Sequence, residues 1–208
     1  MAVYCVILAG GGGLRLGGVN KSAIRMGSEN LATSVYNRLN PQSDFLSITN
    51  TNLDDSSGLP HDVANLVDGF TPQIGPLGGI YAGYCWAKSI GGADNEDFLL
   101  VAPVDTPCFP TDFVRRARSA IGEADVLVAR YGDQEYPTCS LWRLGAASSI
   151  ASTRGSAPNN SIRCYLENLD VTYLNFAPYH VENPFKNVNK ISDLIHLDRG
   201  AAKIVGMA

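Results

Sequence analysis

Leu8-Ala-Gly-Gly-Gly-Gly-Leu-Arg-Leu-Gly-Gly-Val-Asn-Lys21 is the stretch that decides the fold, because here the apolar run Val3–Leu8 ends in a glycine loop that also holds two cations, Arg15 and Lys21. Glycine has no Cβ, so the backbone N–H groups of such a loop can approach oxygen atoms closely and adopt φ > 0. The two cations supply charge that backbone dipoles cannot. The stretch therefore predicts a phosphate-rich ligand, first of all a nucleoside triphosphate.

Two common phosphate-binding patterns do not fit this loop. The dinucleotide fingerprint G-x-G-x-x-G fails because Arg15 or Leu16 stands where its last glycine is required. The P-loop pattern G-x-x-x-x-G-K-[ST] fails because Arg15 and Asn20 replace its two glycines. A glycine-rich turn without a ligand is the remaining alternative, and the entropic cost of so many glycines argues against it.

The length and composition limit the classes of protein that the chain can represent. Its 208 residues predict one domain, spanning residues 1–208. The net charge of −4 leaves no basic surface for nucleic acid, so we expect no nucleic-acid partner. No apolar window approaches the roughly 18 residues that a membrane span needs, and the N-terminus lacks the basic region of a signal peptide. Five cysteines without a C-x-x-C pair favour buried free thiols in a reducing compartment. We therefore expect a cytoplasmic protein with no membrane partner.

Continuous apolar runs alternate with helical patterns along the chain, and the former predict buried strands. The expected strands are Val3–Ala9, Phe45–Thr49, Val63–Val67, Phe98–Ala102, Asp125–Arg130, Tyr136–Arg143, for which antiparallel pairing is one option, and Val171–Phe176. The expected helices are Leu31–Leu39, one opened by Gly75–Gly79, one from Pro110 to Gly122, Leu144–Ala151, Ile162–Leu169 and Ile191–Leu197. This order predicts a three-layer α/β fold with a mostly parallel sheet.

Polar groups follow several of the expected strands. In open α/β sheets, ligands bind outside the carboxyl ends of the strands. The glycine loop, Asn50, Asp68 and Asp105 each follow a strand, so we expect them to share one site. Asp68 precedes a glycine and can equally be a turn residue.

Asp105 follows the most hydrophobic strand and stands between Pro103 and Pro107. A carboxylate at the rim of a buried strand needs a partner, and beside a triphosphate loop that partner is naturally Mg²⁺. The alternative is that Asp105 caps the helix that follows. The triphosphate loop favours the metal. Together these features suggest phosphoryl or nucleotidyl transfer, in which positioning and charge neutralisation do most of the work.

The glycine loop also resembles the signature L-A-G-G-x-x-x-R-M-G-G-x-D-K of molybdenum cofactor guanylyltransferases, the MobA family. Gly75-Pro-Leu-Gly-Gly-Ile80 is similar to the family's G-P-L-x-G-[IM], and Val104-Asp-Thr-Pro107 to its C-D-[TM]-P. Tyr136-Pro-Thr138 stands where the family has [HQ]-P-[TL]. The segment from Phe185 to Leu194 resembles F-x-N-[VI]-N-T-x-x-[DE]-L. The resemblance covers nearly the whole chain.

The resemblance implies a Rossmann-like nucleotidyltransferase fold and a reaction that joins GMP, taken from Mg-GTP, to the terminal phosphate of molybdopterin. It implies that the backbone of Leu8, Ala9, Gly10 and Gly11 contacts the nucleotide. It further assigns the phosphates to Arg15 and Lys21 as catalytic cations, the guanosine to Asn50 and Asp68, and Mg²⁺ to Asp105. On the pterin side, the resemblance implies Gly78, Pro137, Asn187 and Asn189. From spacing alone, capping of the expected last helix is the favoured role of Asn187 and Asn189.

GTP and the molybdenum cofactor are the implied small-molecule partners, and molybdenum-insertion proteins and apo-molybdoenzyme chaperones are the implied protein partners. The chain departs from the family pattern at Asn20, Leu16 and Lys190, where the pattern has Asp, Met and Thr. Two other hypotheses remain. One is a related nucleotidyltransferase that uses CTP or a sugar phosphate, and the other is a nucleotide-binding adaptor with little turnover.

Overall fold

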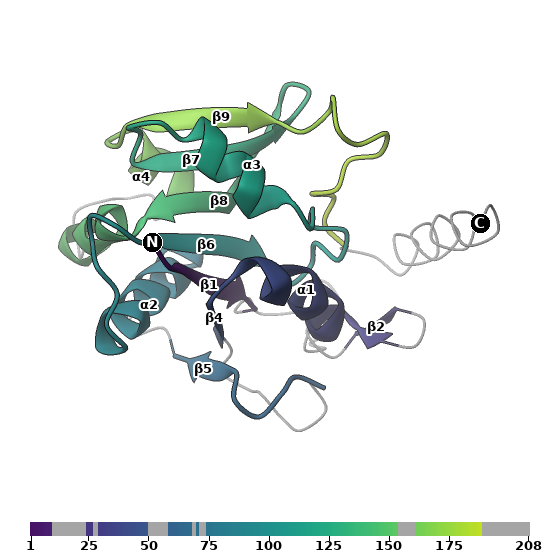
Figure 1. Ribbon diagram of the computed structural model, residues 1–208, viewed down its shortest axis with the longest axis horizontal. Coiled ribbons are helices and arrows are strands. Elements are labelled where there is room, and N and C mark those ends of the chain that lie inside the picture. The colour runs from purple at the N-terminus through teal and green to yellow at the C-terminus, as the bar shows by residue number, and fades with distance from the viewer. Residues whose placement is uncertain are drawn as a thin grey trace.

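Seven strands form one mixed sheet in the order β5-β4-β1-β6-β8-β7-β9, and Figure 1 shows them in this order from bottom to top. The computed structural model describes residues 1–9, 24–26, 29–49, 58–67, 70, 74–153 and 161–188. The strands are β1 (Val3–Leu8), β4 (Phe45–Thr49), β5 (Ala64–Leu66), β6 (Phe98–Pro103), β7 (Val126–Tyr131), β8 (Gln134–Arg143) and β9 (Val171–Asn175). All neighbouring pairs are parallel except the two that involve β8, so β8 alone runs the other way.

Helices cover both faces of this sheet and complete the three layers. They are α1 (Leu31–Leu39), α2 (Pro76–Ser89), α3 (Phe113–Ala120) and α4 (Ile162–Leu166), with 3-10 segments η3 (Asn40–Gln42) and η5 (Leu144–Thr153). Two short antiparallel strands of two residues each, β2 (Arg25–Met26) and β3 (Glu29–Asn30), precede α1. None of the helices in the described ranges combines the length and the hydropathy that a bilayer crossing requires.

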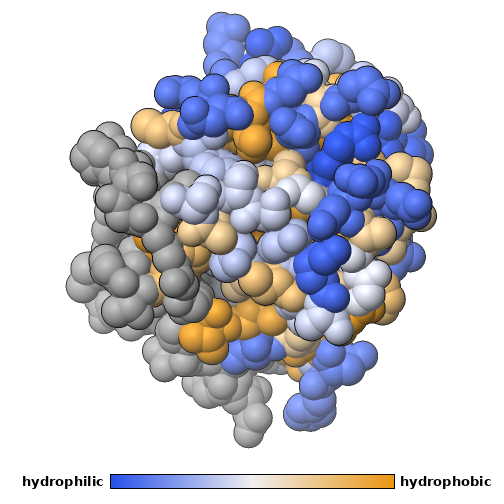
Figure 2. All heavy atoms as spheres, turned by 90° about the vertical axis from the view of Figure 1, so that its left-hand side faces the viewer, coloured by the Kyte–Doolittle hydropathy of each residue, from blue (hydrophilic) through white to orange (hydrophobic). Residues whose placement is uncertain are grey.

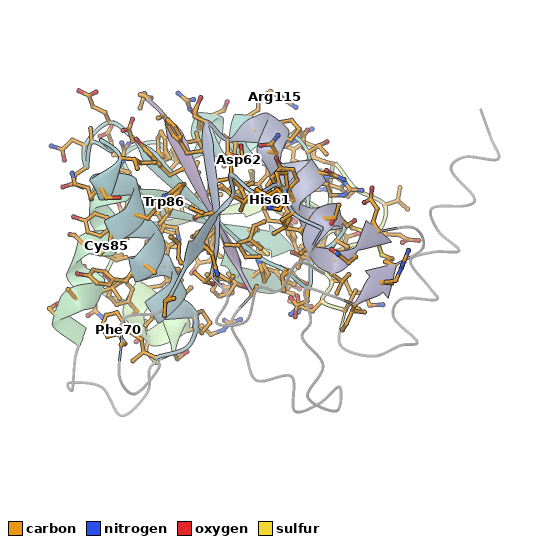
Figure 3. The ribbon with its side chains drawn as sticks, turned by 90° about the horizontal axis from the view of Figure 1, so that it is seen from below. His61, Asp62, Phe70, Cys85, Trp86 and Arg115 are labelled. Carbon is orange, nitrogen blue, oxygen red and sulfur yellow. The ribbon has the colours of Figure 1, made fainter. Side chains whose placement is uncertain are left out.

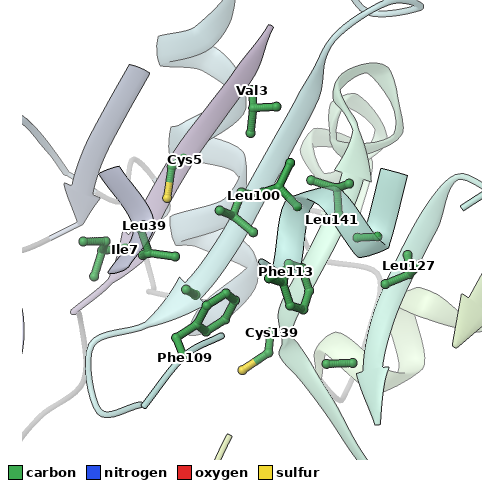
Figure 4. Packing of buried hydrophobic residues seen from close by; sticks show 14 of the residues in the cluster. Val3, Cys5, Ile7, Leu39, Leu100, Phe109, Phe113, Leu127, Cys139 and Leu141 are labelled. Carbon is green, nitrogen blue, oxygen red and sulfur yellow. The ribbon is translucent and has the colours of Figure 1, made fainter. Parts of the chain in front are cut away.

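The apolar residues of β1 divide between two cores because successive side chains of a strand point to opposite faces. Cys5 and Ile7 belong to a cluster with α1 and α3, which Figure 4 shows at close range. Tyr4, Val6 and Leu8 belong to the second cluster, with α2, η5 and α4. An unbroken apolar run is therefore what a strand with helices on both faces requires.

Helix α2 lies unusually close to the sheet. It begins after Gly75, whose φ of +66° is a conformation that favours glycine. A Cβ built on Gly83 would lie 3.0 Å from Val6 Cβ, and one on Gly79 would lie 2.6 Å from Leu8 Cδ2. These two glycines thus allow the helix to contact β1 directly.

The structure confirms the predicted strands to within a few residues and corrects three other predictions. Helix α3 begins at Phe113 and not at Pro110, because residues 110–112 form a turn that Gln42 anchors through Pro110 O (2.9 Å) and Val114 N (3.0 Å). Residues 144–153 form a 3-10 helix, and α4 ends at Leu166, where a turn begins. The expected helix Ile191–Leu197 lies outside the described residues.

All five cysteines are free thiols, but they are not all buried. Cys5 and Cys139 are buried, Cys108 and Cys164 are partly buried, and Cys85 is exposed on the outer side of α2, next to Trp86 (Figure 3). Burial raises the pKa of the Cys139 thiol well above its usual value, and the carboxylate of Asp105 raises it further. The prediction of free thiols is correct, and the prediction of their burial is wrong for Cys85.

Candidate active site

The candidate site lies at the edge of the sheet where β1, β4 and β6 end side by side. Leu8 pairs with Thr49 on one side and with Pro103 on the other. Two backbone hydrogen bonds extend this pairing, from Ala9 N to Thr49 O (3.1 Å) and from Val104 N to Leu8 O (3.0 Å). Leu8 and Ala9 therefore lie between the ends of two strands, directly before the glycine loop in the chain. The opposite end of the sheet, where β1 and β6 begin, presents many hydrophilic side chains (Figure 2).

Asp105 lies at this edge, in a turn just after β6, and is 8% exposed with its Oδ1 atom buried. The turn is closed by Thr106, whose Oγ1 donates to Pro103 O at 2.8 Å. The next helix is α3, and the residue at its N-cap position is Asp112. The helix-capping interpretation of Asp105 is therefore wrong, and its carboxylate does not perform that structural task.

The beginning of β8 reaches the same edge because β8 is antiparallel to β6. The pairing between β7 and β8 shifts register here, since Val128 pairs with Ser140 but Ala129 pairs with Tyr136. Residues 137–139 form the resulting bulge, at a place where a proline without an N–H costs no ladder hydrogen bond. Ser140 holds the bulge, because its Oγ donates to Pro137 O (2.8 Å) and accepts from Trp142 Nε1 (2.8 Å).

A late segment of the chain, residues 183–188, also contacts this edge. Val188 N donates to Asp105 O at 2.8 Å, so the backbone beside the predicted Asn187 lies against the Asp105 turn. The Asn187 side chain itself is exposed, and Phe185 is fully buried. On the other side of the site, Gly78 is buried in the first turn of α2, next to the glycine that packs on Leu8.

Six of the residues predicted from the sequence lie in the described ranges, each on or next to an element that reaches this edge: Leu8, Ala9, Gly78, Asp105, Pro137 and Asn187. The other seven lie outside the described residues: Gly10, Gly11, Arg15, Lys21, Asn50, Asp68 and Asn189. Sequence reasoning did not identify Ser140 or the contact of Val188 with Asp105. Neither has a local signal, because each depends on a partner in another strand or turn.

The donor atoms at this edge fit magnesium better than a metal held by protein alone. Across the described part of the chain, no group of three or more His, Cys, Asp or Glu side chains gathers to hold a metal ion. Structural zinc and calcium sites need several protein ligands, whereas Mg²⁺ uses one or two carboxylates together with substrate phosphates. A buried carboxylate at the edge where β1 and β6 end matches the second arrangement.

Comparisons with known proteins agree with this geometry. A family model described as "MobA-like NTP transferase domain" matches residues 5–171. A protein of Cereibacter sphaeroides named molybdenum cofactor guanylyltransferase is 34% identical over 206 residues, which cover 93% of this chain and 94% of the relative.

Two solved structures share the fold. Molybdopterin-guanine dinucleotide biosynthesis protein A from Archaeoglobus fulgidus has a TM-score of 0.72 at 20% identity, covering 96% of this chain and 98% of its own. 2-C-methyl-D-erythritol 4-phosphate cytidylyltransferase from Thermus thermophilus has a TM-score of 0.68 at 12% identity, covering 97% and 100%. The predicted α/β nucleotidyltransferase fold is confirmed.

Proposed function

The chain belongs to the MobA-like NTP transferase family, and from this membership we propose that it transfers GMP from Mg-GTP to the terminal phosphate of molybdopterin, forming molybdopterin guanine dinucleotide and pyrophosphate. The observation that carries the proposal is the match over almost the whole chain to a named guanylyltransferase, together with Asp105 at the edge where β1 and β6 end.

In this proposal the nucleotide lies over the ends of β1 and β4. The backbone of Leu8, Ala9, Gly10 and Gly11 holds it, with Asn50 and Asp68 at the guanosine. Lys21 and Arg15 neutralise the phosphates. Asp105 would hold Mg²⁺, which when bound supplies positive charge to the triphosphate. The sheet edge supports this arrangement because it fixes the backbone of Leu8 and Ala9 between two strands before any ligand arrives.

The reaction needs little proton chemistry. An oxygen of the molybdopterin phosphate attacks the α-phosphorus of GTP, a new P–O bond forms, and the bond from that phosphorus to the bridging oxygen of the β-phosphate breaks. The attacking phosphate is already ionised at neutral pH, so no strong general base is required. The chain contributes orientation and charge stabilisation, which are the main terms in such transfers.

In this proposal the acceptor lies near Pro137, Asn187 and Asn189 on the β8 side of Asp105, and it extends across the site to Gly78, beside the glycine that packs on Leu8. We also propose one domain over residues 1–208, a cytoplasmic location, and molybdenum-insertion proteins and apo-molybdoenzyme chaperones as partners. The five free thiols support a reducing compartment.

The test is pyrophosphate release from GTP by the purified chain with Mg²⁺ and molybdopterin. Asp105→Asn should lower kcat by at least about a hundredfold, the size expected when a charge-stabilising group is lost from a transfer site. Asp97→Asn is the matched control, because Asp97 is also 8% exposed but lies before β6, at the opposite end of the sheet. Equal turnover in the Asp105 variant and the wild type would remove Asp105 from the metal role.

Calorimetry with GTP and CTP tests the choice of nucleotide. Tighter binding of CTP would replace guanylyl transfer by a related cytidylyl transfer. Binding of GTP without pyrophosphate release in the presence of molybdopterin would favour the adaptor hypothesis.

A further inference from the structure

The side chains of Tyr136 and Asn183 connect the start of β8 to the segment 183–188. Asn183 Nδ2 donates a hydrogen bond to the Tyr136 hydroxyl, while Asn183 Oδ1 accepts one from Phe185 N at 3.0 Å. The ring of Tyr136 also lies 5.3 Å from the ring of Phe185, measured between centroids. One asparagine thus fixes the local turn and links it to the sheet. We call this pair of residues the Tyr136–Asn183 latch.

Buried aromatic packing fixes the position of the segment beyond the latch. Phe185 is fully buried, and its ring lies 5.0 Å from Phe176, 5.8 Å from Phe109 and 6.2 Å from Phe113. Only three residues further on, Val188 N donates to Asp105 O. Residues 183–188 are therefore held at three points: Asn183 bonds Tyr136, Phe185 is buried, and Val188 bonds the Asp105 turn. The backbone between these points has little freedom to move.

The latch lies on one side of the site only. Tyr136 belongs to β8, which pairs with β6 on the side away from β1 and β4. Leu8 and Ala9 contact the ends of β4 and β6, and no hydrogen bond of the latch reaches them among the described residues. A change at the latch should therefore move the backbone near Asn187 without moving the backbone that precedes the glycine loop.

We propose that Tyr136 and Asn183 are positioning residues for the acceptor: their hydrogen bond sets where residues 187 and 188 lie against Asp105, and so sets the affinity for the molybdopterin substrate and not that for GTP. This inference rests on the proposed function for its substrate, but its structural part does not.

The test compares Tyr136→Phe, Asn183→Ala and the double variant with the wild type. The first readout is hydrogen–deuterium exchange at the Val188 amide, which needs no activity. Loss of one hydrogen bond of typical strength should speed this exchange about fivefold in Tyr136→Phe, and Asn183→Ala, which also removes the acceptor of Phe185 N, should speed it at least as much. The double variant should exchange no faster than Asn183→Ala, because the bond that Tyr136→Phe removes is already absent there.

The second readout is the pair of KM values in the guanylyl-transfer assay. The KM for molybdopterin should rise about fivefold in Tyr136→Phe, while the KM for GTP stays unchanged. Tyr165→Phe is the matched control: it also loses a partly buried hydroxyl contact, with Ser149 and Ala146, but on the other face of the sheet. That variant should lose stability and keep both KM values.

An unchanged Val188 exchange rate in Tyr136→Phe would overturn the proposal that the Tyr136–Asn183 hydrogen bond positions residue 188. An equal rise in both KM values, or a fall in kcat alone, would overturn its specific role toward the acceptor. If the wild type does not transfer guanylyl groups at all, the proposed function fails, and the exchange experiment still decides whether the latch holds residue 188.

Discussion

Replacing Gly79 by alanine tests whether the close packing of α2 on β1 shapes the nucleotide side of the site. The new Cβ would lie 2.6 Å from Leu8 Cδ2 and 3.4 Å from Thr49 Cγ2. Apolar carbon atoms pack best at about 3.5–4.0 Å, so the Leu8 methyl must move by about 1 Å. Because Leu8 is the last residue of β1, we expect this shift to reach the backbone of Leu8 and Ala9.

The Gly79→Ala change should affect both the stability of the fold and the affinity for GTP, and the two effects can be measured separately. Overpacking costs about 1–3 kcal/mol, and replacing glycine in a helix interior returns about 1 kcal/mol, so the free energy of unfolding should fall by about 0–2 kcal/mol. If the bound nucleotide loses one backbone hydrogen bond worth about 1 kcal/mol, the Kd for GTP should rise about fivefold. Urea denaturation measures the first quantity, and calorimetry with Mg-GTP measures the second.

Gly83→Ala is the matched control on the same helix. Its Cβ would lie 3.0 Å from Val6 Cβ and 3.4 Å from Leu99 Cδ1, both in the middle of the sheet. Val6 Cβ is attached directly to the backbone and cannot turn away, so this variant should be destabilised at least as much as Gly79→Ala. Its Kd for GTP should remain that of the wild type. Wild-type GTP affinity in Gly79→Ala, or equal weakening in both variants, would refute the reasoning.

Two further predictions concern the ends of the sheet and the thiols. Burial alone would raise the pKa of Asp97, but hydrogen bonds from the backbone N–H groups of Ala93 and Ala2 outweigh it, and the pKa lies below its usual value. Asp97 therefore stabilises the fold by about 1–3 kcal/mol at neutral pH. In denaturation experiments over a series of pH values, the difference in free energy of unfolding between wild type and Asp97→Asn should shrink as the pH falls below about 4. A difference that stays constant down to pH 2 would contradict this. In thiol labelling of the native protein, Cys85 should react fastest, whereas Cys5 and Cys139 should react only after unfolding, since burial raises the pKa of both thiols. Rapid native labelling of Cys139, read by mass spectrometry, would show that the Asp105 edge is open to solvent.

Much of the fold could be predicted because its strands are unbroken apolar runs. Val3–Leu8 and Phe98–Pro103 are buried along their whole length, so tertiary packing and local pattern agree there. The start of α3 could not be predicted, because Pro110 is a good first helical residue locally and the competing anchor is Gln42, far away in the sequence.

In the candidate site, too, features with a local sequence signal could be predicted and features set by distant contacts could not. Asp105 could be singled out as a candidate from its place after a hydrophobic strand, and only the structure could exclude the helix cap, because that depended on where the next helix begins. The bulge before Ser140 and the bond from Val188 to Asp105 have no signature in the sequence, since both are set by pairing between distant strands. The exposure of Cys85 was missed for a related reason. Helix α2 is apolar around most of its circumference, and its aromatic residues Tyr81, Tyr84 and Trp86 are only partly buried, so the pattern could not indicate which side faces the sheet.

The order of strands has a consequence for how such a protein can diverge. The first four strands of the main sheet occupy one contiguous half, β5-β4-β1-β6, and the last three occupy the other, β8-β7-β9. The proposed nucleotide side is thus encoded before residue 104, and the proposed acceptor side mostly after residue 125. Substitutions in the later half can select a new acceptor while the nucleotide half is inherited unchanged. Asp105 stands at the junction of the two halves, so its proposed metal would serve both the nucleotide and the acceptor.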